Sequence, residues 1–175
     1  MYRLFDWYEA IRDFLEIGGP VLRVIGVLTL VMWVLIFERV FFYRFGYREL
    51  VKSVIDTWKA RPERRSWNAR QIRRALISRV TLSVEQNLGL IKTLVALCPL
   101  LGLLGTVTGM INVFEVMAFS GSGNPRSMAA GVSMATIPTM AGMVGALSGL
   151  FATTLLSRFA HREVEQLRAE LTTEG

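Results

Sequence analysis

The chain has 175 residues, of which 52% are hydrophobic and 19% charged, and its mean hydropathy is +0.40. Between Thr93 and Ser157 the only ionisable side chains are Glu115, Arg126 and the thiol of Cys98. A water-soluble fold needs polar side chains over its surface, and disordered chains have low hydrophobicity, so both classes are excluded. A single cysteine also excludes a disulfide framework and a cysteine-based metal site. The composition predicts an all-α integral membrane protein.

The N-terminal segment, residues 1–20, combines acidic side chains with apolar ones at helical spacing. These apolar residues are Leu4, Tyr8, Ile11 and Leu15. The pattern predicts a short amphipathic helix on the outer face of the membrane. Gly18-Gly19-Pro20 is expected to end this helix. Because four acids precede the first apolar core, we expect no cleaved signal peptide.

Three apolar stretches are long enough to cross a membrane, since a helix needs about 20 mainly apolar residues to span the roughly 30 Å hydrocarbon core. They cover residues 21–43, 93–119 and 128–157. The first is long enough only with Arg23 and Glu38 at its edges, where long side chains reach the headgroups. The sequence therefore predicts three transmembrane helices.

The segments between these spans differ in charge, and the difference indicates the topology. Residues 39–92 carry 13 Lys or Arg and four Asp or Glu, whereas the loop 120–127 carries one charge, Arg126. Positively charged loops stay in the cytoplasm. We therefore expect residues 44–92 and the tail 158–175 inside the cell, and the N-terminus outside. The basic region can contact anionic lipid, whereas nucleic acid is not expected, because few aromatic residues accompany the charges.

The basic region is expected to be structured. Arg61-Pro62 indicates a turn, and Ser66-Trp67-Asn68 predicts the start of a helix that reaches about Val80. Ser83-Val84-Glu85-Gln86 has the form of a capping box, which would start the helix of the second span inside the cytoplasm. In the tail, helical spacing predicts an extension of the third helix. The spaced residues are Val164, Leu167 and Leu171.

The second and third spans contain many small residues and two prolines. Small residues let membrane helices approach closely, and a proline removes a backbone donor inside a helix. The residues that we assign to close packing and kinks are Pro99, Gly102, Gly105, Gly109, Pro138, Gly142, Gly145 and Gly149. Taken alone, this pattern favours tight packing within one monomer.

Two threonines are predicted near mid-membrane. Thr106 lies about 21 Å past Lys92, and Thr139 about 20 Å past Arg126, at 1.5 Å per residue. The hydroxyl of a single threonine in a helix most often bonds a carbonyl of the same helix. Two threonines at one depth make a polar pathway through the membrane an equal alternative to that interpretation. A proton relay needs Asp, Glu or His within the membrane. Glu115 lies near the outer boundary, so the sequence predicts a channel wall whose titrating group belongs to another chain.

At these motifs the chain resembles the MotA/TolQ/ExbB proton-channel family, and most of all the compact ExbB proteins of TonB systems. The resemblance rests on Pro99, on Gly102-Leu103-Leu104-Gly105-Thr106-Val107-x-Gly109-Met110, on Glu38-Arg39 at the cytoplasmic end of the first span, and on the third span with Thr139 and Gly142. It implies an inner-membrane homopentamer with its N-terminus in the periplasm. Such a pentamer surrounds the helices of a small ExbD- or TolR-type partner, whose Asp binds the proton.

The same resemblance implies that Thr106 and Thr139 line the pore, and that proton flow energises a TonB-like protein and thereby outer-membrane transport. No catalytic residue, metal or cofactor is expected, and the chain is not expected to be an enzyme. The sole histidine, His161, lies in the basic tail, where a solvated helix residue is expected.

Two departures from the family pattern stand in the third span. Met134 occupies a position where many relatives have Glu, and Gly145-Ala146-Leu147-Ser148 replaces a frequent Ala-Ala-Ile-Pro. A role that depends on that Glu is therefore not carried over. Three spans argue against a MotA-type stator, which has four. A TolQ-type subunit and a membrane scaffold that conducts no ions stay open as alternatives, and the hydroxyls are compatible with either protons or sodium.

Overall fold

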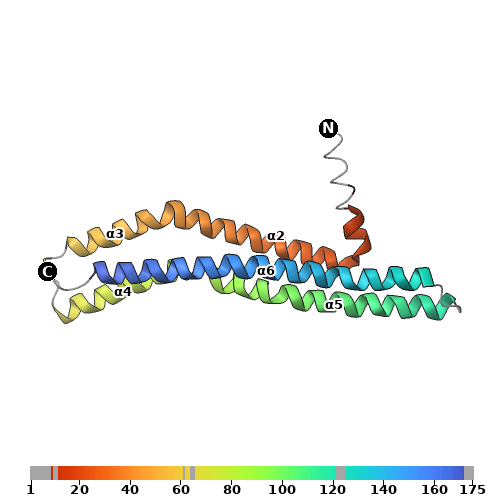
Figure 1. Cartoon of the computed structure of the whole chain (residues 1–175). Helices are drawn as coiled ribbons and strands as arrows, with labels where there is room; N and C mark the ends of the chain where they lie inside the picture. Colours follow the sequence, from red (N-terminus) through yellow and green to blue (C-terminus); the bar gives the residue numbers. More distant parts are fainter. Residues whose placement is uncertain (1–8, 10–11, 61, 64–65, 121–124, 172–175) are drawn as a thin grey trace, which may run out of the picture. The chain divides into compact units, whose positions relative to one another are not determined.

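In the computed structural model the described residues are 9, 12–60, 62–63, 66–120 and 125–171, and nearly all of them are helical (Figure 1). This described part of the chain contains no strand, so the expected all-α class is confirmed. In chain order the elements are α2 (Gly19–Phe41), the π-helical turn η1 (Phe42–Gly46), α3 (Tyr47–Lys59), α4 (Trp67–Glu85), α5 (Leu88–Ser120) and α6 (Pro125–Glu170).

Three helical stretches, at residues 19–59, 67–119 and 128–170, are long and apolar enough to cross a membrane. Large apolar side chains on them face outward, including Leu103, which is 61% exposed, and Val144, which is 69% exposed. In water such a surface would be unfavourable, whereas in lipid it is the expected one. The three predicted membrane helices are confirmed as helices, and each continues beyond its predicted span.

The chain divides into two compact units. The first comprises residues 1–33 and 93–150, and the second comprises residues 34–92 and 151–175. The first unit thus holds the start of α2, most of α5 and the first half of α6. The second holds the end of α2, η1, α3, α4, the first turn of α5 and the rest of α6.

The N-terminal part of the first unit follows the predicted pattern where it is described. Residues 12–17 are helical, and the chain turns at Gly18 before α2 begins. Gly19 has φ +69°, a left-handed conformation that glycine adopts without steric cost. Pro20 follows within the first turn of α2, where its missing N–H breaks no helical bond. Leu15 is half-buried, and the other predicted apolar positions, Leu4, Tyr8 and Ile11, lie outside the described residues.

In the second unit α4 begins as predicted but ends later. The hydroxyl oxygen of Ser66 accepts a 3.2 Å hydrogen bond from the N–H of Ala69 and caps the helix. The predicted capping box at Ser83 is wrong, because Ser83 lies inside α4 and its hydroxyl donates to the carbonyl oxygen of Arg79, 3.1 Å away. The break comes instead at Gln86 and Asn87, where Asn87 has φ 62°. Asparagine tolerates this left-handed conformation, which ends a helix.

The connections and the tail of the second unit also agree with the predicted elements. α3 ends at Lys59 and Pro62 lies outside any helix, as expected for a turn; Arg61 is outside the described residues. α6 continues through the tail to Glu170, so the predicted helical extension is confirmed. The spaced apolar residues of the tail, Val164, Leu167 and Leu171, are all buried.

Candidate functional site: a small-residue helix contact and a polar junction

In the first unit α5 and α6 lie side by side and antiparallel, and glycines form the contact between them (Figure 1). A methyl group on Gly142 would lie 2.5 Å from the carbonyl oxygen of Cys98, and one on Gly109 would lie 2.5 Å from the Cα of Ala135. One turn before Gly109, Gly105 packs against the side chain of Pro138. The two backbones therefore touch, which leaves no room for a side chain at these positions.

α2 joins this contact from one side. A methyl group on Gly145 would lie 3.1 Å from the Oγ1 of Thr29, and one on Gly149 would lie 2.5 Å from the Sδ of Met32. An apolar cavity of about 680 Å³ lies between the start of α2 and α6, with Thr29, Ala141 and Gly145 in its lining. Pro138 is buried in the helix contact, whereas Pro99 is exposed on α5.

Thr139 lies at the contact of α5 with α6. Its hydroxyl donates a 3.0 Å hydrogen bond to the carbonyl oxygen of Gly102 on α5. The hydroxyl of Thr106, one turn beyond Gly102, donates to its own backbone at Leu103, 2.6 Å away. Both threonines are half-buried. The hydroxyl of Thr139 therefore bonds between two helices, whereas that of Thr106 bonds within its own helix.

Both threonines lie on the edge of the contact that is turned away from α2. Ala141, which faces the cavity beside α2, is two residues past Thr139 and therefore about 200° around the helix. On α5, a methyl group on Gly105 would lie 3.4 Å from the side chain of Val21 of α2, and Thr106 lies about 100° further around the helix. Neither threonine lines the cavity beside α2. The two hydroxyls are therefore on one shared edge formed by α5 and α6.

This edge carries hydroxyls but no group that titrates near neutral pH at its centre. Within residues 93–119 and 128–157 the ionisable side chains are Cys98 and Glu115. Cys98 is buried in the helix contact, and Glu115 lies nine residues past Thr106. Among the described residues, no group of three or more His, Cys, Asp or Glu could hold a metal ion. The edge therefore offers hydroxyl groups that can donate and accept hydrogen bonds.

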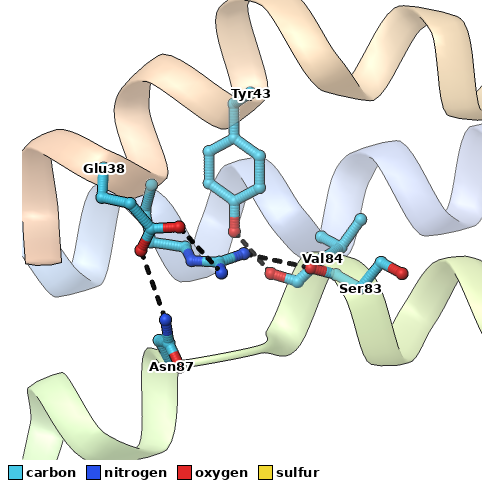
Figure 2. Close-up of polar contacts among 6 residues, drawn as sticks. Glu38, Tyr43, Ser83, Val84 and Asn87 are labelled. Carbon is cyan, nitrogen blue, oxygen red and sulfur yellow. Dashed lines mark hydrogen bonds and ion pairs between the residues drawn. The ribbon is translucent and has the colours of Figure 1, made fainter.

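The second unit contains a polar junction, which we define as Glu38, Arg39, Tyr43 and Asn87 together with the carbonyl groups that end α4 (Figure 2). Arg39 is only 3% exposed, and its guanidinium donates to the carbonyl oxygen of Ser83, 3.1 Å away. The hydroxyl of Tyr43 donates a 2.7 Å hydrogen bond to the carbonyl oxygen of Val84. The last carbonyls of a helix have no partner within it, and one side chain of α2 and one of η1 supply partners for two of them.

Glu38 links both sides of the junction. One carboxylate oxygen accepts from the Arg39 guanidinium at 3.2 Å, and the other accepts from the side-chain amide of Asn87 at 3.2 Å (Figure 2). The guanidinium also lies over the ring of Phe42, 5.2 Å from its centroid. The Nε atom of Arg39 is buried without a hydrogen-bond partner in the described part of the chain. The break between α4 and α5 is therefore held by side chains of α2 and η1.

Sequence reasoning found Glu38 and Arg39 but missed their partners. Tyr43 follows Arg39 by four residues and so lies on the same helix face, which was an available signal. Asn87 was detectable only as a residue type that tolerates positive φ. The carbonyl groups of Ser83 and Val84 carry no sequence signal, because any residue has one.

Comparison with known proteins gives consistent matches over much of the chain. A family model described as the MotA/TolQ/ExbB proton channel family matches residues 44–169. An ExbB-like 1 biopolymer transport protein of Synechocystis sp. is 37% identical over 83 residues, which are 46% of this chain and 33% of that protein. The biopolymer transport protein exbB1 of Vibrio cholerae is 39% identical over 88 residues, 50% of this chain and 39% of that protein. The matches thus span between a third and two fifths of these relatives' length.

Proposed function

The chain belongs to the MotA/TolQ/ExbB proton channel family and is a multi-pass membrane protein, and from this premise we propose that it is an ExbB-type proton-channel subunit rather than an enzyme. It resides in the inner membrane, with its N-terminus in the periplasm and its C-terminus in the cytoplasm. The surplus of Lys and Arg in residues 39–92 supports this orientation. Both curated relatives carry ExbB names, which favours the ExbB type over the TolQ type.

The observation that carries the proposal is the shared edge with Thr106 and Thr139. Their hydroxyls line a proton route that α5 and α6 form together. Each hydroxyl can donate and accept hydrogen bonds, so it can bond to water or to a carboxyl group along the route. Because no Asp, Glu or His lies near the centre of residues 93–119 or 128–157, the proton-binding carboxyl group comes from the partner.

The active form is a homo-oligomer, a pentamer by family resemblance, in which the shared edges of the copies face a central pore. A small single-span ExbD-like protein occupies that pore and supplies the membrane Asp. Proton flow through the assembly energises a TonB-like protein and thereby outer-membrane transport. The exposed apolar surface along α5 and α6 supports an assembly in which these helices are covered by lipid and by neighbouring copies.

The test is native mass spectrometry of the full-length protein, extracted from its own membranes in mild detergent with whatever remains bound. We expect five copies together with a small single-span protein that has an Asp in its helix. The same assembly in liposomes that contain a pH-sensitive dye should conduct protons down an imposed gradient. A monomer or dimer without such a partner in several mild detergents, and without proton flux, would contradict the proposal and favour a scaffold. Flux driven by a sodium gradient alone would show that the transported ion is sodium and not the proton.

A further inference from the structure

Another cavity lies in the second unit, and its lining includes neither of the two threonines and none of the four side chains of the polar junction. It has a volume of about 580 Å³ and opens between the end of α4, the first turn of α5 and α6. Its polar lining residues are Glu85, Lys92, Ser157 and His161. Unlike the cavity beside α2, it presents charged groups, so a polar ligand suits it better than an acyl chain.

Ser157 has an unusual hydroxyl group. Helical serines and threonines normally bond a carbonyl three or four residues earlier, as Thr81 does at Ile77 and Ser148 at Gly145. The Oγ of Ser157 is buried and has no hydrogen-bond partner in the part of the chain that the structure describes. A buried polar atom without a partner is unfavourable, so this hydroxyl is suited to donate to a bound group.

The basic side chains beside Ser157 suit an anion. Lys92 forms no ion pair among the described residues. His161 can donate an N–H, and its Nε2 lies 3.8 Å from the carboxylate of Glu165, with both side chains exposed. The cavity also borders the first turn of α5, the positive end of the dipole of a 33-residue helix. Among the described lining residues Glu85 is the one acid, and it can accept a hydrogen bond from a donor attached to the anion.

The cavity lies where two predicted spans leave the membrane. Lys92 immediately precedes the second span and Ser157 ends the third, so the cavity is at the level of the lipid headgroups. From this position and this donor set, we propose that the cavity binds the phosphate group of a phospholipid headgroup. The phosphate accepts hydrogen bonds from Lys92, Ser157 and His161, and a headgroup amine or hydroxyl donates to Glu85. Free phosphate offers the same anion without a tail, and the test separates the two sources.

The experiment uses the full-length protein in its native assembly, washed free of lipid in detergent. Phosphatidylethanolamine, phosphatidylglycerol, phosphatidylcholine and inorganic phosphate are added separately, and retained lipid and the apparent melting temperature are measured. We expect the first two lipids to be retained and to raise the melting temperature. Lys92→Met should weaken this binding about tenfold, whereas Lys52→Met, at an exposed position on α3, should not.

Ser157→Ala distinguishes ligand binding from a structural role. Without lipid this variant should melt at the same temperature as the wild type or higher, because it removes an unpaired buried hydroxyl. With lipid it should show a smaller rise in melting temperature. A rise caused by inorganic phosphate, with no lipid retained, would assign the site to free phosphate. Equal binding of phosphatidylcholine, whose headgroup has no donor, would overturn the role of Glu85. Equal lipid binding by Lys92→Met and Lys52→Met would contradict the proposed lipid site. This result would not depend on whether the assembly conducts protons.

Discussion

The hydroxyl of Thr139 donates a hydrogen bond to the backbone carbonyl oxygen of Gly102, 3.0 Å away and 37 positions earlier in the chain. The bond crosses the α5–α6 contact at the point where the absence of a side chain on Gly102 lets the backbones approach. A methyl group on Gly102 would lie 3.0 Å from the Cα of Thr139. The same residue pair therefore combines close helix packing with a polar group on the shared edge.

Thr139→Val should lower proton flux at least tenfold in liposomes that contain the assembly with its partner. Valine keeps the volume and β-branching of threonine but removes the hydroxyl group, so packing changes little. Thr139→Ser restores a hydroxyl and should restore most of the flux. Thr136→Val is the matched control, because Thr136 lies on an exposed face of α6 and, within the described part of the chain, its hydroxyl bonds its own helix at Ser133. Full flux in Thr139→Val would contradict the pore role.

Gly142→Ala should lower the free energy of unfolding by about 1–3 kcal/mol, the usual cost of overpacking. The added methyl group would meet the carbonyl oxygen of Cys98, a backbone atom that cannot rotate away. Gly26→Ala is the control, because no atom of the described residues beyond its chain neighbours and the backbone of its own helix lies within 4 Å of a methyl group there. That change should leave the stability unchanged or raise it slightly, since alanine favours helix. Thermal unfolding in detergent measures both, and equal melting temperatures would argue against backbone contact.

Arg39→Met should destabilise the junction between α4 and α5. The guanidinium is buried and donates to the carbonyl oxygen of Ser83, so its loss leaves that acceptor unpaired, at a cost of about 1–3 kcal/mol. Glu38, whose side chain is 48% exposed, can be solvated instead. Amide hydrogen exchange at residues 84–88 should become faster than in wild type. Arg48→Met, at an exposed position on α3, should leave the exchange unchanged, and similar exchange in both variants would contradict this role of Arg39.

Asn87→Ala and Asn87→Gly should differ in stability. Both lose the exposed hydrogen bond to Glu38, but only alanine is strained at φ 62°. A left-handed conformation costs a residue with a Cβ about 1–2 kcal/mol, and glycine adopts it freely. We therefore expect the apparent melting temperature of Asn87→Ala to fall below that of Asn87→Gly. The reverse order would mean that the two helices are not broken by a left-handed residue at this point.

Local signals in the sequence were sufficient for most of the fold. Hydropathy and helical periodicity depend on neighbouring residues, so they predicted the three long apolar helices, the helix that starts at Ser66-Trp67-Asn68 and the helical tail with Val164, Leu167 and Leu171. The break before α5 was misplaced at Ser83, because a capping-box pattern and a residue in the middle of a helix look alike in sequence. The hydroxyl of Ser83 donates to the carbonyl oxygen of Arg79, one turn earlier in the same helix. A pattern of residue types does not reveal whether a serine makes this bond or caps the start of a new helix.

The sequence by itself determined that this protein is helical and has three segments long and apolar enough to cross a membrane, and it predicted two threonines at one depth, because these properties follow from the order of apolar, charged and small residues. The tertiary structure decided which groups meet. It joined Arg39 to Ser83 and Thr139 to Gly102, and it buried the hydroxyl of Ser157 without a hydrogen-bond partner among the described residues. The physical reason is that hydrogen bonds between distant helices depend on how their backbones pack, and packing depends on the shapes of all contacting side chains at once.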